Sequence, residues 1–210
     1  MGTVFVGSQE GRVYALDLKT GCARWSFSAA AEVRTGIVLS LSEAPISKDN
    51  PPLAYFGDII ARFYAVNALT GELVWSLKAD DHPSATLTGT PAFYEGTLFV
   101  PVSSLEVIPA ADPGYECCTF RGSVLAIDGT KGSVLWRHYT IQGEPSEVSR
   151  TSVGTRVLAP SGAPVWSSPT VDRKRGLIYV GTGENYSSPA DGNSDAVLAI
   201  DMATGARVWT

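Results

Sequence analysis

The sequence predicts an all-β chain that forms part of a β-propeller, with about four blades in a single domain over residues 1–210. A frame of an apolar pair, Ala, Asp or Asn, Gly and Trp occurs four times, and further short apolar strands lie between the copies. No stretch indicates a helix of any length. The four copies are Gly11–Trp25, Ala61–Trp75, Gly122–Trp136 and Asp195–Trp209.

Each copy is expected to form a β-hairpin. In the first copy, GRVYALDLKTGCARW, the alternating residues before Asp17 predict one strand and the residues after Gly21 predict the next. Asp bonds to nearby backbone through its side chain and Gly adopts positive φ, so this pair supplies the turn. A small residue stands at one fixed place in every copy, which leaves room for a large group: Ala15, Ala65, Ala126 and Ala199. We expect the tryptophan that ends each unit to dock between neighbouring units: Trp25, Trp75, Trp136 and Trp209.

The segments between the copies complete the blades. The runs PLAYFGD, GTLFVPV and GLIYVGT each predict a further strand, so each repeat has roughly four short strands. That number favours propeller blades over a solenoid. The spacing between copies is unequal, and we assign the extra length to three loops, Ser103–Thr119, Gln142–Pro164 and Asn185–Asp195. Loops of this length in a compact fold are commonly functional or disordered.

The composition indicates a globular protein and argues against two classes of partner. Of the 210 residues, 44% are hydrophobic and only 18% are charged, which is typical of a packed core. The net charge of −5 disfavours non-specific binding to nucleic acid or to an anionic membrane surface. Apolar runs such as Gly176–Gly181 are much shorter than the roughly 20 residues of a membrane helix. Because the chain starts inside a β pattern and stops directly after a repeat, we expect it to be a fragment.

The repeated A-x-D-x-x-T-G-x-x-x-W unit resembles the tryptophan-docking motif of the pyrroloquinoline quinone (PQQ) dehydrogenases, eight-bladed propellers that oxidise alcohols. The resemblance covers nearly the whole chain, which corresponds to about half of such a propeller. Non-catalytic scaffold propellers with PQQ-like repeats carry the same motif, so residues outside the repeat must distinguish the two classes. The stretches SSLE…ECCTFRGSVLAID and WSSPTVDRKRGLIYVGTGENYSSP look most like the polyvinyl alcohol dehydrogenase branch of the group.

The segment Thr86–Glu106 looks like the part of these enzymes that lies under the quinone. The resemblance implies that Thr88, Ser103 and Ser104 bond the cofactor and that Glu106 coordinates Ca²⁺. The chemistry is reasonable because Ca²⁺ prefers hard oxygen ligands. The alternative for Glu106 is a solvated side chain in a loop, the usual place of glutamate.

A second matching segment is Gly162–Pro189. Trp166 lies where the family keeps the tryptophan that forms the floor under the quinone ring, although it could also be another aromatic residue that packs a blade. After the Gly-Thr-Gly turn the family commonly has an Asn ligand for Ca²⁺. Here Glu184 occupies that place and Asn185 follows it, so either could be the ligand. In AEVRTG, Arg34 lies near the family's quinone-binding arginine, with a solvated arginine as the alternative.

The adjacent cysteines Cys117 and Cys118 can close a vicinal disulfide, while two free thiols or a link to Cys22 also fit the sequence. No Cys-x-x-Cys is present, which argues against a metal or haem site built on cysteine. PQQ methanol dehydrogenases hold a vicinal disulfide against one face of the quinone, although in an earlier blade. By this resemblance we expect the pair to lie near the cofactor. A disulfide also implies an oxidising compartment, hence a periplasmic or secreted protein.

The expected function is therefore PQQ- and Ca²⁺-dependent oxidation of a secondary or polymeric alcohol, with electrons passed to a cytochrome c-like acceptor. In the family a carboxylate base takes the hydroxyl proton, and that Asp lies in the blade after the Gly-Thr-Gly segment. We therefore expect the base beyond Thr210 and assign it to no residue of this chain. The alternatives are a non-catalytic scaffold propeller and an inactive, truncated dehydrogenase, and we expect the isolated chain not to turn over.

Overall fold

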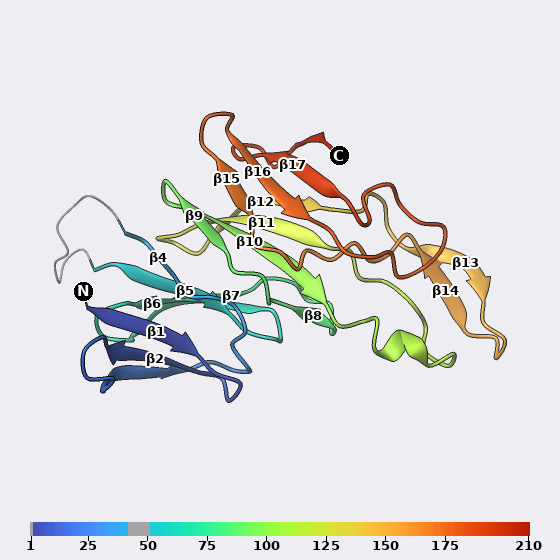
Figure 1. The fold of residues 1–210 in the computed structure, drawn as a ribbon. Coiled ribbons are helices and arrows are strands. Elements are labelled where there is room, and N and C mark those ends of the chain that lie inside the picture. Colours follow the sequence, from blue (N-terminus) through green and yellow to red (C-terminus); the bar gives the residue numbers. More distant parts are fainter. Residues whose placement is uncertain (1, 42–50) are drawn as a thin grey trace.

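Four antiparallel sheets follow one another along the chain in the computed structural model, which describes residues 2–41 and 51–210 (Figure 1). The first sheet contains β1 (Thr3–Gly7), β2 (Arg12–Asp17) and β3 (Ala23–Ser28). The second contains β4 (Val38–Leu39), β5 (Leu53–Gly57), β6 (Arg62–Asn67) and β7 (Leu73–Lys78). The third contains β8 (Ala85–Thr86), β9 (Ala92–Tyr94), β10 (Thr97–Ser104), β11 (Ser123–Asp128) and β12 (Val134–Tyr139). The fourth contains β15 (Thr170–Asp172), β16 (Leu177–Gly181), β17 (Val197–Asp201) and β18 (Arg207–Trp209). These sheets confirm the predicted partial propeller of about four blades.

The predicted repeat forms the last hairpin of each sheet. In the first hairpin, Asp17 Oδ1 accepts hydrogen bonds from the backbone N–H groups of Lys19 and Thr20, and Gly21 has φ of +70°. The carboxylate thus satisfies two turn amides, and Gly supplies the left-handed backbone that other residues adopt at a cost. Equivalent bonds are made by Asn67, Asp128 and Asp201. Each hairpin also has a register shift directly after its Ala–Trp pair.

The repeat tryptophans join neighbouring sheets. Trp75 lies directly opposite Ala65 in the register of β6 and β7, so the small side chain leaves room for the indole. Its Nε1 donates to the carbonyl of Gly129, in the turn of the next sheet, at 3.0 Å. A Cβ on Gly132 would lie only 2.6 Å from the ring, so the turn packs tightly on the indole. Trp25 and Trp136 dock in the same way, donating to Ala68 and Met202. These three tryptophans confirm the predicted docking.

The fourth repeat tryptophan has a different environment. Trp209 lies opposite Ala199, and its ring is 5.8 Å from that of Tyr179. It is 47% exposed, and the part of the chain that the structure describes contains no sheet beyond β18 on which it could pack.

The hydrophobic core consists of three layers, one between each pair of consecutive sheets. Because successive side chains of a strand point to opposite faces, β5 serves two layers: Phe56 packs toward the first sheet and Tyr55 toward the third. The layer between the third and fourth sheets contains Phe99, Val124, Ile178 and Leu198, among others. Face-to-face packing of consecutive sheets is the arrangement of propeller blades.

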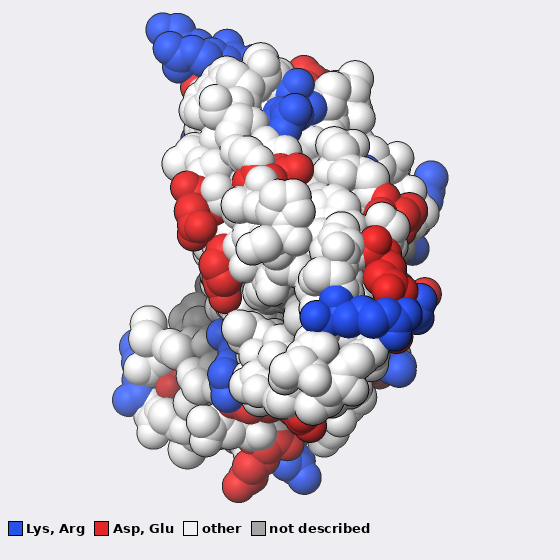
Figure 2. Space-filling model, turned by 90° about the vertical axis from the view of Figure 1, so that its right-hand side faces the viewer, with Lys and Arg blue, Asp and Glu red and all other residues white. Residues whose placement is uncertain are grey.

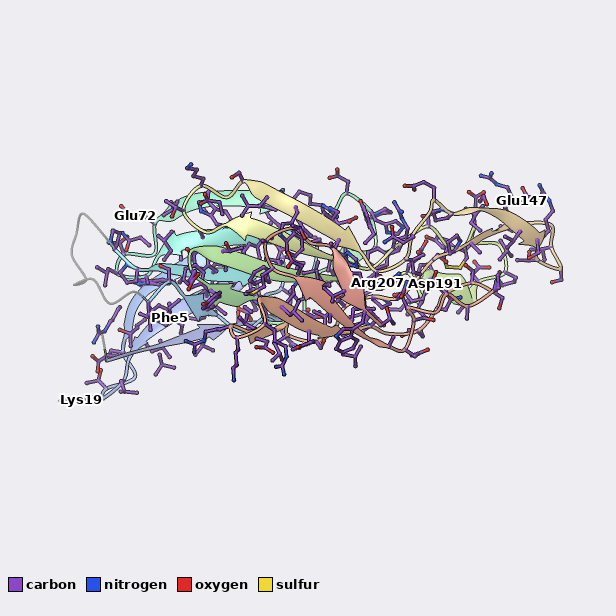
Figure 3. All side chains as sticks on the ribbon, turned by 90° about the horizontal axis from the view of Figure 1, so that it is seen from above. Phe5, Lys19, Glu72, Glu147, Asp191 and Arg207 are labelled. Atoms are coloured by element: carbon purple, nitrogen blue, oxygen red, sulfur yellow. A yellow bond between two sulfur atoms is a disulfide. The ribbon has the colours of Figure 1, made fainter. Side chains whose placement is uncertain are left out.

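The structure corrects two details of the predicted loops. Residues 142–164 are not loop throughout, because β13 (Ser146–Arg150) and β14 (Arg156–Ala159) form a separate hairpin. This hairpin projects from one end of the molecule, with Glu147 far from Phe5 and Lys19 (Figure 3). Ser103 and Ser104, placed at the start of a loop, instead end strand β10. The loop that follows contains one short 3₁₀ turn, Pro109–Ala111.

The surface is of mixed charge. Basic and acidic residues are interspersed among uncharged ones on the face drawn in Figure 2. Within residues 2–41 and 51–210, no helix has the length and hydropathy needed to cross a membrane.

Candidate functional site

Three segments, which precede the edge strands β4, β9 and β15 of consecutive sheets, pack side by side. The backbone N–H of Gly36 donates to Thr90 Oγ1 at 2.9 Å, which joins the Arg34 segment to the Thr88 segment. A Cβ on Gly89 would lie 3.0 Å from the carbonyl oxygen of Trp166, so the Thr88 segment also packs on the Trp166 segment. The fold therefore brings Arg34, Thr88 and Trp166, which are far apart in the sequence, into one region.

Backbone hydrogen bonds hold the two residues before Trp166, while the indole ring of Trp166 stays accessible. The neighbouring Val165 donates its N–H to the carbonyl of Val102 in β10, and Gly183 donates to the carbonyl of Pro164. Gly183 also lies under the indole, because a Cβ there would be 3.1 Å from Cδ1 and Nε1. The side chain is nevertheless 37% exposed. Among the described residues Trp166 Nε1 has no hydrogen-bond partner, whereas three repeat tryptophans each donate to a carbonyl. A fixed, accessible indole is suited to stacking on a flat ligand.

Of the three predicted hydroxyl residues, Thr88, Ser103 and Ser104, only Thr88 is partly accessible. Ser103 is buried, donates to the carbonyl of Thr86, and shares a 3.2 Å hydrogen bond with Thr88 Oγ1. Ser104 is buried as well, and its Oγ accepts the backbone N–H of Glu106. In this structure the two serines orient their neighbours, and their role in holding a cofactor stays a prediction.

Arg34 is about half exposed and pairs with Glu32, with 2.8 Å between Nε and Oε1. The hydrogen bond with Glu32 raises the pKa of Arg34 above its already high ordinary value. The side chain is thus a permanent cation, suited to a carboxylate or a carbonyl oxygen. Its contact with a quinone stays a prediction.

Glu106 has the most complete set of hydrogen bonds in the region. It is fully buried, which rules out the alternative of a solvated loop residue. Its carboxylate accepts the backbone N–H groups of Thr119 and Phe120 at 3.0 and 2.9 Å, and the hydroxyl of Tyr115 at 3.2 Å. His82 Nε2 lies 3.4 Å from Oε1. Burial acts to raise the pKa of Glu106, but the hydrogen bonds from His82 and the two amides outweigh burial and lower it.

Cys117 and Cys118 form a vicinal disulfide across a cis peptide bond, while Cys22 is free and exposed. Of the predicted alternatives, the link between adjacent cysteines is therefore the one present. Leu158 of β14 donates its N–H to the carbonyl of Cys117, and Cys118 donates to the carbonyl of Leu158. Cys118 is buried and Cys117 is half-buried. These backbone bonds run to Leu158 and not to Trp166, so contact of the disulfide with a cofactor stays a prediction.

The two candidate ligands after the Gly-Thr-Gly turn lie in a loop that bonds mainly to itself. Glu184 is exposed, and its carbonyl accepts the N–H of Ala163. Asn185 Oδ1 accepts the N–H of Asp191, and its Nδ2 donates to the carbonyl of Ser187. Whether either residue binds Ca²⁺ stays a prediction.

The residues of this region fit PQQ better than they fit Ca²⁺. A flat, accessible indole with a cation and a hydroxyl nearby is a suitable donor set for an aromatic acid such as PQQ. Ca²⁺ needs six to eight oxygen ligands, and the described residues contain no group of three or more His, Cys, Asp or Glu side chains able to hold a metal ion. Because donors already surround the carboxylate of Glu106, this residue as it lies here does not fit the role of a Ca²⁺ ligand.

Sequence reasoning missed the partners of Glu106. His82 lies in the segment after β7, and Tyr115 lies beyond the 3₁₀ turn. No repeat or spacing links these positions, since the contacts depend on how two inserted loops fold back on β10. The weak sequence signal was the aromatic and polar content of the loops, GYECCTF and GENYSS.

Comparison with known proteins places the whole chain in one group. A PQQ-repeat family described as "Outer membrane protein assembly factor BamB" matches residues 1–210. Two proteins named polyvinylalcohol dehydrogenase, from Pseudomonas sp and Sphingopyxis sp. (strain 113P3), are each 39% identical over 98% and 99% of this chain, which covers 32% and 31% of their lengths. The crystal structure of quinohemoprotein alcohol dehydrogenase from Comamonas testosteroni has a TM-score of 0.72 at 22% identity, over 99% of this chain and 33% of that protein. The chain thus spans about a third of the length of these relatives.

Proposed function

Because the chain belongs to the PQQ-repeat propellers and, within them, to the quinoprotein alcohol dehydrogenase family, we propose that the protein oxidises an alcohol with bound PQQ. The proposal extends to a secondary or polymeric alcohol as substrate, because the two relatives at 39% identity are named for polyvinyl alcohol. It also includes Ca²⁺ as a second cofactor, a cytochrome c-like electron acceptor and a periplasmic or secreted location, the last supported by the disulfide Cys117–Cys118.

The observation that carries the proposal is the environment of Trp166. Its side chain is 37% exposed although the two residues before it are held by backbone hydrogen bonds, Val165 to Val102 and Pro164 to Gly183. An exposed tryptophan with a rigid backbone costs hydrophobic burial without contributing to the core. A stacked planar ligand would recover that burial and would explain why this tryptophan stands apart from the repeat ones.

The residues around Trp166 have distinct roles in this proposal. PQQ, when bound, supplies a quinone that accepts the hydride of an alcohol. Trp166 presents a flat apolar face and fixes the plane of the ligand. Arg34 offers a guanidinium that hydrogen-bonds and neutralises an anionic oxygen. Thr88 offers a hydroxyl whose direction is set by its bond to Ser103.

A titration of the full-length protein with PQQ, with and without Ca²⁺, tests the proposal. We expect saturable binding of one PQQ per protein and alcohol-dependent dye reduction by the loaded protein. Absence of PQQ binding in both conditions would contradict the proposal.

The second candidate is a non-catalytic scaffold, which the description of the matching family favours. The docked tryptophans need no cofactor for their packing, so the fold alone is compatible with this function. A full-length protein that is folded and stable but does not bind PQQ supports the scaffold.

A further inference from the structure

A buried carboxylate ties together the two sides of the disulfide loop, defined here as residues 115–120. Glu106 lies two residues after the end of β10 and has no exposed surface. A buried carboxylate is costly unless charge-assisted hydrogen bonds satisfy it. The donors come from both sides of Cys117–Cys118: Tyr115 before the pair, and Thr119 and Phe120 after it.

His82 completes the set of donors. Its Nε2 lies 3.4 Å from Glu106 Oε1 and 3.0 Å from Thr119 Oγ1, while Nδ1 accepts the N–H of Ser84 at 3.1 Å. Since Nδ1 is an acceptor, Nε2 carries the hydrogen and points it toward Glu106 and Thr119. An ionised carboxylate offers about four lone-pair sites, and the loop and His82 occupy them.

The opposite face of the loop is held by backbone bonds. Leu158 donates to the carbonyl of Cys117, Cys118 donates to the carbonyl of Leu158, and Gly162 donates to the carbonyl of Phe120. The loop is thus fixed between β14 and Glu106, with Cys118 fully buried. Removal of the carboxylate would free one face and leave the amides of Thr119 and Phe120 without partners.

We propose that Glu106 is a positioning residue that clamps the disulfide loop against β14, and that it is not a ligand of the family's metal ion. The oxygens needed for Ca²⁺ are not gathered around it: Glu184 is exposed and Asn185 Oδ1 bonds to Asp191. The proposal concerns the loop and holds whether or not the protein is a dehydrogenase.

The test is Glu106→Gln in the full-length protein, with two measurements. The first is the rate at which dithiothreitol reduces Cys117–Cys118, followed by thiol labelling and mass spectrometry well below the unfolding temperature. Because the amide of Gln turns a donor toward donors, we expect reduction to be about tenfold faster or more. The second is the affinity for Ca²⁺ by calorimetry, which we expect to change by less than about twofold.

Two further variants serve as a second test and as a control. Tyr115→Phe removes one donor without leaving a buried charge, and we expect a rise in reduction rate of about two- to fivefold if Glu106→Gln does not fold. Glu116→Gln is the matched control, since Glu116 lies in the same loop but pairs with Arg156 at the surface. Exposed pairs contribute little, so we expect a change of less than about threefold.

The outcomes separate this proposal from the proposed function. An unchanged reduction rate in Glu106→Gln, or a loss of Ca²⁺ affinity of tenfold or more, would overturn the proposal. If the wild-type protein binds no Ca²⁺, the calcium part of the proposed function fails, while the reduction rates still decide the role of Glu106.

Discussion

Two environments of tryptophan can be compared in this chain, the docked one at the end of the first three repeats and the one at Trp166. Trp25, Trp75 and Trp136 pack on a glycine of the next sheet and donate Nε1 to a carbonyl. Trp166 packs on a glycine as well, Gly183, but keeps 37% of its surface exposed and has no partner for Nε1 among the described residues. The same side chain thus serves packing in the first case and is available for a ligand in the second.

In a repeat fold, residues that belong to the repeat and residues outside it carry different information. A residue that recurs with the repeat serves a contact that recurs with the blades, so it carries information about the fold. A residue of the same type outside the repeat has no such contact to make. We therefore expect the docked tryptophans to stabilise the fold and Trp166 to contribute little to stability.

The largest expected effect is from Trp75→Ala. This change removes a half-buried indole that contacts the rings of Tyr55 and Phe63 and fills the space over Gly132. Truncation of a packed aromatic side chain costs about 3 kcal/mol or more of unfolding free energy. Chemical denaturation of the full-length variant measures this loss of unfolding free energy. A loss no larger than that of Trp166→Ala would contradict the distinction between docked and accessible tryptophans.

A smaller effect is expected from Gly132→Ala. A Cβ at this position would lie 2.6 Å from the ring of Trp75, and the backbone has φ of +72°. Gly176→Ala is the matched control, because it has φ of +69° but open space around the new Cβ. The control should cost about 1 kcal/mol from the backbone alone, and Gly132→Ala about 1–3 kcal/mol more. Equal costs would mean that the turn does not need its close contact with the tryptophan.

The smallest effect concerns acid stability. The hydroxyl of Thr204 and then turn amides donate to Asp201, and these bonds lower the pKa of Asp201 below its ordinary value of 3.8. Stability from this turn is therefore fully present above pH 3.8 and is lost as pH falls through the lower pKa of the folded state. Asp201→Asn should flatten the fall in unfolding temperature below that pH, because Asn67 makes the equivalent bonds without a charge. An unchanged acid profile would argue against this role.

The repeat made most of the fold predictable from the sequence. Turn positions such as Asp17 and Gly21, and the docked Trp75, follow from local chemistry that recurs four times. The hairpin β13–β14 was not predictable, because Ser146–Arg150 has Val148 as its one large apolar residue and is exposed throughout. Alternation of polar and apolar residues, the main signal of a strand, is absent there.

The candidate site was predictable only in part. Trp166 and Glu106 were found by resemblance to a known motif, and the structure places the first on an accessible face and the second in a buried network. The partners of Glu106 could not be found, because His82 and Thr119 meet only through the folding of two loops that belong to no repeat. Backbone amides, which supply two of its hydrogen bonds, leave no trace in the residue types.

The most direct test of the comparison is the affinity of the full-length protein for PQQ in Trp166→Ala, measured together with its unfolding temperature. We expect PQQ to bind at least about tenfold more weakly, with the unfolding temperature within about 2 °C of the wild type. Trp166→Phe should keep most of the affinity because it keeps a flat ring. Wild-type affinity in Trp166→Ala, or a loss of stability as large as that of Trp75→Ala, would contradict the account.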